Sequence, residues 1–413
     1  MARIGFGAFL APHHPIGEHP MLQFRRDLDF AEHLDKMGYD EFWCGEHHSS
    51  GWEMISSPEM FLAAAAERTK RIKLGTGVVS LPYHNPLNVA NRMIQLDHMS
   101  GGRAIFGSGP GALSSDAYAL GIDPMVQRDR QDEAIGVIKR LMAGERVTHQ
   151  SDWFTLRDAA VQLLPLQEEM PFVTASQISP SGMTLAGKHG IGVISIGSLS
   201  TEGLTALPQQ WEFAEDSARK HGKTVDRKNW RVLMSWHIGE TREKAQEQAG
   251  RGLMRHHNEY IVGTLQRPGA KPFKSVDDAI EKMSTAPGSA ATIGTPDDLV
   301  KTIKSVIEMS GGLGTIVGFA HDWANIRDTF NSWEMVARYV IPEINGYIAG
   351  LRRSQKHVIE NRESFERARD AIMSKIMEND KAAAALAVTR SGRFAAASGS
   401  NVPDLEKAAK KKA

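Results

Sequence analysis

The chain has 413 residues, 41% of them hydrophobic and 24% charged, with 49 Lys plus Arg against 49 Asp plus Glu. This balance excludes a protein that binds nucleic acid or anionic membranes through a basic excess. The balance is uneven, because residues 352–413 carry 14 basic against 8 acidic residues, so a basic tail follows a mildly acidic body.

Short apolar runs alternate along the chain with longer amphipathic segments. The expected strands are residues 4–9, 41–44, 72–79, 104–107, 172–174, 192–196, 232–237 and 314–319. Several of them are continuously hydrophobic, as is typical of strands buried on both faces of a parallel sheet. The expected helices are residues 21–37, 58–70, 86–99, 128–142, 181–189, 209–221, 241–260, 296–309 and 326–348. Eight strands with helices between them predict an α/β fold, a (β/α)8 TIM barrel.

Three segments do not fit this repeat. Residues 144–171 and 262–294 are expected as insertions into a barrel domain of residues 1–351. Residues 352–413 form a charged helical extension with an Ala-rich part and a Lys-ended tail, and the end of it (401–413) is expected to be solvated or disordered. The alternative fold is an open doubly wound sheet, but the first strand leads into APHH at 11–14 rather than a Gly-rich nucleotide loop.

The compartment follows from two absences in the sequence. The single cysteine, Cys44, cannot form an internal disulfide and lies in the apolar run FWC, which favours a buried structural residue in a reducing cytoplasm. The N-terminus lacks the pattern of a signal peptide, and no apolar run approaches the ~18 residues of a membrane span. We therefore expect a cytoplasmic protein with no membrane contact.

The strongest local signal is GEHH at 45–48, just beyond the second expected strand, where barrel enzymes collect their active-site residues. An imidazole there can donate or accept a proton near pH 7, and Glu46 can orient it. The alternative is a hydrogen-bonded pair that packs the top of the barrel. Adjacent histidines on a strand point to opposite faces, so we predict no metal site. A metal hydrolase that uses His13, His14, His47 and His48 is the remaining metal alternative.

Four further loops follow expected strands. Glycines in LGTGVVSLPYH at 74–84 permit the close approach of a flat ligand, and GSGPG at 107–111 exposes backbone N–H groups. The run ASQISPS at 175–181 is either an ordinary N-cap or a phosphate-binding cup. His321 and Trp323 after the last strand, with Trp52 after His48, either line a pocket for a ring-shaped ligand or pack as core.

Taken together, these motifs carry a resemblance to a known family. The run GYDEFW at 38–43 leading into EHH, LDHMSGGR at 96–103, and GTPDDL at 294–299 followed by a Gly-rich strand are similar to signatures of the bacterial-luciferase-like flavin monooxygenases. The resemblance covers about residues 1–350. The runs at 51–59, 80–84 and 109–111 look most like the limonene 1,2-monooxygenase-type subgroup.

The resemblance implies a (β/α)8 barrel and a two-component FMN-dependent monooxygenase. Reduced FMN would come from a separate NAD(P)H:flavin reductase and react with O2 to a flavin C4a-hydroperoxide, which oxygenates an organic substrate. We expect that substrate to be small, apolar and terpene-like, because the pocket must exclude water. The pattern does not choose among epoxidation, hydroxylation and Baeyer–Villiger insertion.

The family motifs also assign roles to residues of this chain. His47 matches the catalytic histidine, and the non-proline cis peptide bond found under the flavin of relatives would fall between Gly77 and Val78. Ser108 stands where light-emitting members have a cysteine, and Gly109 where relatives have a phosphate-binding arginine, which argues against light emission. The resulting cofactor-binding set is Gly77, Val78, Ser108, Gly109, Ser176, Gln177, Ser179 and Ser181. The expected substrate-pocket residues are His14, Trp52, His84, His321 and Trp323.

Two alternative functions remain at this point. A deazaflavin-dependent oxidoreductase of the same superfamily would have a more basic cofactor site than this acidic body suggests, and a non-catalytic flavin-binding barrel is the other alternative. The apolar stripe between Val358 and Ile376 on the charged tail helix, together with the resemblance, predicts a homo-oligomer, a dimer or higher.

Overall fold

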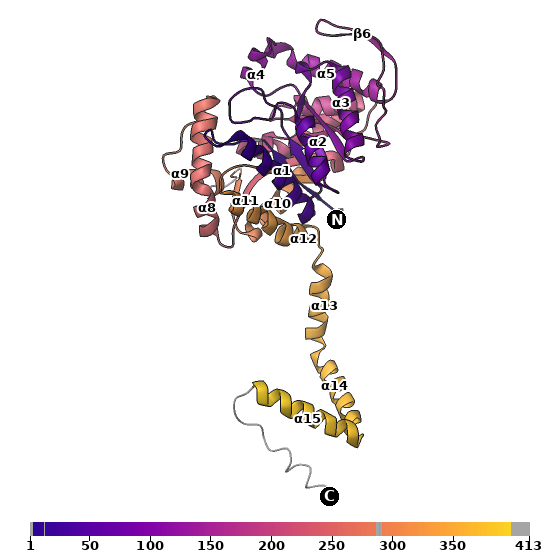
Figure 1. Ribbon diagram of the computed structural model, residues 1–413, viewed down its shortest axis with the longest axis vertical. Coiled ribbons are helices and arrows are strands. Elements are labelled where there is room, and N and C mark those ends of the chain that lie inside the picture. The colour runs from indigo at the N-terminus through magenta and orange to yellow at the C-terminus, as the bar shows by residue number, and fades with distance from the viewer. Residues whose placement is uncertain (1–2, 12, 286–288, 290, 398–413) are drawn as a thin grey trace. The chain divides into compact units, whose positions relative to one another are not determined.

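The computed structural model of the chain describes residues 3–11, 13–285, 289 and 291–397 (Figure 1). Its contacts divide the chain into two compact units, Met1–Gly346 and Tyr347–Ala413. The division predicted from the sequence, between residues 351 and 352, falls close to this boundary and stays a prediction. The expected disorder of residues 401–413 concerns a segment outside the described residues.

The first unit is a closed barrel of eight parallel strands, which confirms the predicted fold class. Each strand pairs with its neighbour in the order β1–β2–β3–β5–β8–β9–β10–β12, and β12 pairs with β1 to close the ring. The strands of the barrel are β1 (Gly5–Leu10), β2 (Glu41–Cys44), β3 (Lys73–Thr76), β5 (Ala104–Gly109), β8 (Phe172–Ser176), β9 (Gly192–Ser195), β10 (Trp230–Ile238) and β12 (Thr315–Ala320). Two short strands extend this sheet: β4 (Val79–Ser80) pairs with β5, and β11 (Ala291–Gly294) pairs with the second half of β10. A separate antiparallel hairpin consists of β6 (Val147–Gln150) and β7 (Thr155–Ala159).

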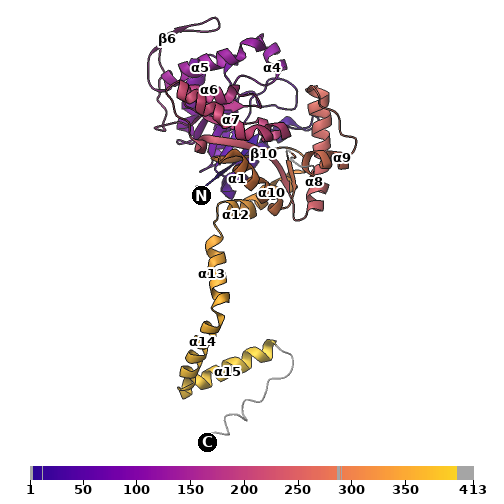
Figure 2. The ribbon, with the colours of Figure 1, turned by 180° about the vertical axis from the view of Figure 1, so that it is seen from behind.

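Helices surround the barrel and connect its strands. Figure 2 shows α6 and α7 together on the outside of the barrel, where they pack against each other. The helices of this unit are α1 (Pro20–Met37), α2 (Pro58–Arg68), α3 (Pro86–Met99), α4 (Ser114–Ala119), α5 (Gln127–Met142), α6 (Ser181–His189), α7 (Thr201–Lys220), α8 (Arg242–Arg255), α9 (Val276–Ile280), α10 (Pro296–Ser310), α11 (Ile326–Met335) and α12 (Ile341–Ile344). Three π-helical segments continue helices of this unit: η5 (His256–Thr264), η6 (Glu281–Thr285) and η7 (Val336–Val340). The 3₁₀ turns among the described residues of this unit are η1 (Leu81–Tyr83), η2 (Pro124–Val126), η3 (Gly197–Leu199) and η4 (Arg227–Asn229).

The structure differs from the sequence prediction at several element boundaries. The strand expected at 72–79 is interrupted after Thr76 and resumes as β4. The helix expected to begin at residue 209 begins at Thr201 instead. Pro208, the residue before the expected start, lies inside α7. The helices expected at 241–260 and 326–348 each change to π-helical geometry within their length. The structure adds α4, α9 and β11, which have too few residues for a clear hydrophobic period.

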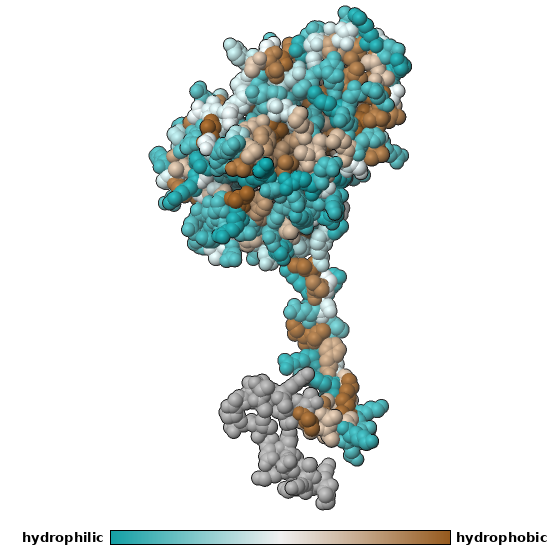
Figure 3. Space-filling model, in the orientation of Figure 1, coloured by the Kyte–Doolittle hydropathy of each residue, from teal (hydrophilic) through white to brown (hydrophobic). Residues whose placement is uncertain are grey.

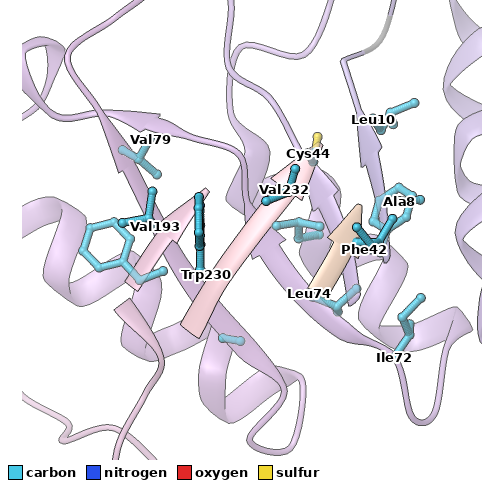
Figure 4. Packing of buried hydrophobic residues seen from close by; sticks show 14 of the residues in the cluster. Ala8, Leu10, Phe42, Cys44, Ile72, Leu74, Val79, Val193, Trp230 and Val232 are labelled. Atoms are coloured by element: carbon cyan, nitrogen blue, oxygen red, sulfur yellow. The ribbon is translucent and has the colours of Figure 1, made fainter. Parts of the chain in front are cut away.

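The barrel strands are continuously hydrophobic because they are buried on both faces. Phe9, Trp43 and Ile105, with matching residues of the other strands, fill the inside of the barrel. The alternate residues, among them Phe42 and Cys44, pack outward against the helices, as the close view of this layer shows (Figure 4). Cys44 is fully buried, as the sequence predicted. A Cβ atom on Gly75 would lie 2.5 Å from the ring of Trp43, so the glycine makes room for the indole.

The second unit consists of the helices α13 (Ala349–Glu360), α14 (Arg362–Met377) and α15 (Asp380–Ala397). Large apolar side chains stand exposed on the first two of them, as the brown residues in Figure 3 show. These residues are Leu351, Val358, Ile359, Phe365, Ile372 and Met377. No helix in the described part of the chain has both the length and the apolar content to cross a membrane.

Candidate active site

A cavity of about 1210 Å³ lies at the carboxyl ends of β5 and β8. It is bounded by the loop after β5, the amino ends of α5 and α6, and the segment after η5. The carboxyl ends of the strands are the face where barrel enzymes carry their active sites. We refer to this space as the large cavity.

Three of the four residues predicted to bind a phosphate line the large cavity. Gln177, Ser179 and Ser181 border it, and the hydroxyl oxygens of the two serines are 3.0 Å apart. Ser176 is buried instead, and its hydroxyl donates to the carbonyl of Gln177 at 3.3 Å. No side chain caps the amino end of α6, so its first backbone N–H groups are available to a ligand. Free N–H groups and two hydroxyls at a helix amino end suit a bound anion.

Arg128 adds a positive charge to this group and was missed from the sequence. It is the second residue of α5, it lines the large cavity, and its Nη1 donates to the hydroxyl of Ser181 at 2.5 Å. Lys188 also borders the cavity, but its ammonium already pairs with Asp132 at 2.5 Å. No sequence motif links Arg128 to a serine 53 positions later; only the packing of α5 beside α6 brings the two together.

The peptide bond between Gly77 and Val78 is cis, as the family resemblance implied, and Val78 borders the large cavity. Ser108 and Gly109 do not line that cavity. The hydroxyl of Ser108 is buried and donates to the carbonyl of Val173 at 3.2 Å. A Cβ atom on Gly109 would lie 2.4 Å from Cγ2 of Val78, so an arginine does not fit there without movement of Val78. The cation beside the serines therefore comes from α5.

His47 lies between two carboxylates. Its Nε2 is 2.9 Å from Oε2 of Glu53, and its Nδ1 is 3.0 Å from Oδ2 of Asp116. Burial alone would lower the pKa of His47, but the charges and hydrogen bonds of the two carboxylates outweigh it and raise the pKa to about 10. At neutral pH the ring therefore carries two protons, one held toward each carboxylate.

Glu53 joins His47 to a second histidine. Its Oε1 is 3.0 Å from Nε2 of His13 and also accepts a hydrogen bond from the hydroxyl of Tyr260. Burial would raise the pKa of Glu53, but His13 and His47 hold it well below its usual range, so the carboxylate is ionised. Glu53 lies in the family-like run at 51–59 but had no predicted role, and Asp116 lies in none of the predicted motifs. An acidic residue in the otherwise uncharged run GWEMI at 51–55 was the available signal for Glu53.

The other members of the Glu-His-His motif form a separate cluster. Oε1 of Glu46 is 2.8 Å from Nε2 of His48 and 2.7 Å from Nε2 of His84, and Oε2 accepts from the backbone N–H of Ser80. The two imidazole nitrogens and the carboxylate lie within 4.8 Å of one another, close enough to ligate one metal ion. The hydrogen bonds satisfy the buried carboxylate without an ion, and the absence of a metal stays a prediction.

None of the five predicted substrate-pocket residues lines the large cavity. His14 is buried between Asp27 and Asp322, at 2.9 and 2.7 Å, and their hydrogen bonds and charges outweigh the effect of burial and raise its pKa to about 9. His84 belongs to the cluster around Glu46. Trp52 packs on Tyr260, and His321 stacks on Trp323. Their role in substrate binding stays a prediction.

Comparisons with known proteins agree on one family. The family model for luciferase-like monooxygenases matches residues 4–312. The 4-hydroxyprotoasukamycin monooxygenase of Streptomyces nodosus subsp. asukaensis is 46% identical over 367 residues, which cover 87% of this chain and 97% of that protein. The limonene 1,2-monooxygenase of Rhodococcus erythropolis is 43% identical over 364 residues, which cover 88% of this chain and 92% of that protein.

A solved structure extends the comparison to the fold. The oxygenating constituent of 3,6-diketocamphane monooxygenase from Pseudomonas putida, a type II Baeyer–Villiger monooxygenase in complex with FMN, superimposes with a TM-score of 0.70 at 24% identity. The match covers 83% of this chain and 99% of that one. It supports the barrel fold described above.

Proposed function

Because the chain belongs to the luciferase-like monooxygenase family, as its sequence motifs predicted, we propose that it is the oxygenase component of a two-component system that uses reduced FMN and O2. A separate NAD(P)H:flavin reductase supplies the reduced FMN. The observation that carries the proposal is the anion-binding group of Ser179, Ser181 and Arg128 on the wall of the large cavity.

The residues around the large cavity fit FMN. The phosphate would meet the two serine hydroxyls, the guanidinium of Arg128 and the uncapped amino end of α6, a donor set suited to a dianion. Val78 and Gln177 border the same cavity and would contact the rest of the cofactor. A volume of about 1210 Å³ exceeds the ~300–1,000 Å³ that is usual for a small-ligand site, so it can hold a cofactor with space to spare.

When bound, reduced FMN activates O2 and allows one oxygen atom to pass to an organic substrate. His47 contributes a proton reservoir, because both of its ring nitrogens are protonated and are held by Glu53 and Asp116. Buried aromatic residues near it, Trp52 and Tyr260, exclude water from this side of the barrel.

We propose a small, apolar, terpene-like substrate. The name of one relative gives limonene as its substrate, and this substrate class agrees with the aromatic residues near His47. The enzyme transfers one oxygen atom to this substrate, by epoxidation, hydroxylation or Baeyer–Villiger insertion.

The proposal also covers assembly and compartment. We propose a homo-oligomer, because α13 and α14 expose apolar side chains in an otherwise charged extension. A buried Cys44, the single cysteine of the chain, agrees with a reducing cytoplasm.

Anaerobic titration of the full chain with reduced FMN tests the cofactor assignment. Arg128→Met should weaken FMN binding by about tenfold to a hundredfold, because it removes a hydrogen bond to a charged group. Binding of reduced riboflavin, which lacks the phosphate, should not change. Arg130→Met is the matched control, because Arg130 lies on the same helix and pairs with Asp152. Equal losses for FMN and riboflavin would contradict the phosphate site, and preferential binding of a reduced deazaflavin would favour the alternative cofactor.

A further inference from the structure

Five buried nitrogen atoms without a hydrogen-bond partner lie on four residues at the carboxyl ends of β1 and β12 and at the start of η5. They are Nδ1 of His13, Nε2 of His256, both ring nitrogens of His321 and Nε1 of Trp323. Half of all such side-chain atoms in the described part of the chain belong to these four residues. A buried polar atom without a partner costs about 1–3 kcal/mol, so a group of five requires an explanation.

These four residues form two ring pairs, and His13 and His321 border the same small cavity, so we refer to the four as one cluster. The ring of His13 lies 5.0 Å from that of His256, between centroids, and His321 stacks on Trp323. His13, His321 and Trp323 are all more than nine-tenths buried. β1 and β12 are neighbours in the barrel, so His13 and His321 lie in the loops that follow adjacent strands, on the face that carries the active site.

The cluster is connected to His47. Nε2 of His13 is bound to Glu53, and the other carboxylate oxygen of Glu53 is bound to His47. Hydrogen bonds therefore run from Asp116 through His47 and Glu53 to His13, whose Nδ1 is the unpartnered end. Since Glu53 is an ionised acceptor, Nε2 of His13 carries a proton toward it. Nδ1 of His13 is then the ring nitrogen left to meet a ligand.

The other three residues of the cluster, His256, His321 and Trp323, provide hydrogen-bond donors and acceptors but no charge. Burial lowers the pKa of His256 to about 3 and that of His321 well below its usual range, so both rings are neutral at pH 7. Each neutral imidazole has one N–H donor and one bare acceptor, and Trp323 has a donor. Such a set suits an uncharged oxygen function. An anion would be repelled by Glu53, and a hydrocarbon would leave all five atoms unpartnered.

Aromatic rings pack around His13. Tyr260 and Phe319 pack against the ring of His13, at 4.8 and 5.4 Å between centroids, and Trp52 packs on Tyr260. A small cavity of about 30 Å³ borders His13 and His321, with space for one or two waters, and the ionic group of His14, Asp27 and Asp322 also lines it. His256 and Tyr260 lie on η5, a π-helical segment of a kind that is frequent at functional sites, and their side chains would have to move aside for a substrate to reach these nitrogens.

We propose that the substrate of this enzyme carries a hydroxyl or carbonyl oxygen on its apolar skeleton, and that this oxygen binds the nitrogens of His13, His256 and His321. The inference rests on the proposed oxygenase function and specifies its substrate class as an oxygenated terpene-like compound.

The test uses three probes with the same carbon skeleton: limonene, carveol with a hydroxyl, and carvone with a carbonyl. Binding to the full chain is measured by quenching of tryptophan fluorescence, because Trp52 and Trp323 lie at the site. Carveol or carvone should bind at least about tenfold more tightly than limonene, the gain from one net hydrogen bond. The better of the two identifies the oxygen function.

Variants connect the preference to the cluster. His256→Leu and His321→Leu should reduce the preference for the oxygenated probe to about threefold or less, whereas His256→Gln, which keeps a donor and an acceptor, should retain more of it. His98→Leu is the matched control, because His98 lies at the end of α3 and binds the carbonyl of Leu164. If the leucine variants do not fold, the relative affinities of the three probes for the unaltered chain still test whether the substrate carries an oxygen function.

Equal binding of the three probes, tighter binding of limonene, binding of none of them, or a preference that survives both leucine substitutions would overturn the proposal. These results are distinct from a failure of the proposed function, since probe binding is measured without flavin. An enzyme that prefers carveol but does not bind reduced FMN would refute the oxygenase and leave the polar site standing.

Discussion

Substitution of Glu53 by glutamine examines the charge network around His47 most closely. The side chains of Glu and Gln have nearly the same shape, but the amide has no charge and presents one acceptor oxygen instead of two. In the native chain, Oε2 of Glu53 lies 2.9 Å from Nε2 of His47, and Oε1 lies 3.0 Å from Nε2 of His13. The substitution therefore weakens both interactions while the packing is kept.

The structure sets the expected magnitude. A rise in the pKa of His47 from 6.5 to about 10 corresponds to roughly 4 kcal/mol of stability at pH 7. Among the effects that raise this pKa, the charge of Glu53 is the largest, so about half of that free energy depends on Glu53. With the loss of the bonds to His13 and Tyr260, Glu53→Gln should lower the free energy of unfolding by about 3–5 kcal/mol.

The sign of the pH dependence follows from the same values. Because the folded-state pKa of His47 is raised, its contribution is fully present below pH 6.5 and is lost as the pH rises through about 10. The pKa of Glu53 is lowered, so its contribution is present above pH 4.5 and is lost as the pH falls below that value. The difference between native and variant proteins should thus be largest near pH 6 and become smaller toward pH 10.

Urea unfolding at pH 6, 8 and 10 measures this difference. Glu133→Gln is the matched control, because Glu133 also binds a histidine, His149 at 2.7 Å, but in a partly exposed position. Glu133→Gln should lower the free energy of unfolding by less than about 1 kcal/mol. The reasoning is refuted if Glu53→Gln costs less than 1 kcal/mol, or if its cost is the same at pH 6 and pH 10.

Two further predictions concern the barrel and the extension. Gly107→Ala would place a Cβ atom 1.9 Å from the carbonyl oxygen of Thr76, a backbone atom that cannot move aside. The melting temperature should therefore fall by an amount equivalent to about 2 kcal/mol or more. An unchanged melting temperature would contradict the barrel packing. Deletion of residues 352–413 removes most of the exposed apolar residues of α13 and α14, so the mass of the assembly measured by light scattering should fall by more than the mass of the deleted residues. The affinity for FMN should stay within about twofold. A large loss of FMN affinity would contradict this division of roles.

The barrel was predictable because its signal is local. Eight short apolar runs separated by amphipathic segments identify the strands, and burial on both faces explains their continuous hydrophobicity. The start of α7 was not predictable in this way, because Pro208 indicates a helix end when only neighbouring residues are considered. In the structure the helix continues through it from Thr201.

The site was predictable only where a motif kept its residues together. His47 and the serines after β8 stand in continuous family motifs, and the cis peptide bond at Gly77 came from the same resemblance. Asp116 and Arg128 follow no such pattern, since each meets its partner only after elements distant in sequence have packed. The partners of Glu53 could not be identified for the same reason.

The central claim is that the chain transfers one atom of O2 to an organic substrate with reduced FMN. The most direct measurement supplies reduced FMN and ¹⁸O2 to the purified full chain together with limonene, carveol or carvone, and analyses the products by mass. The account predicts a product that has gained a single ¹⁸O atom, and the loss of that product in His47→Ala while FMN is still bound. Oxidation of the flavin to give hydrogen peroxide alone, or a product whose new oxygen comes from water, would contradict the account.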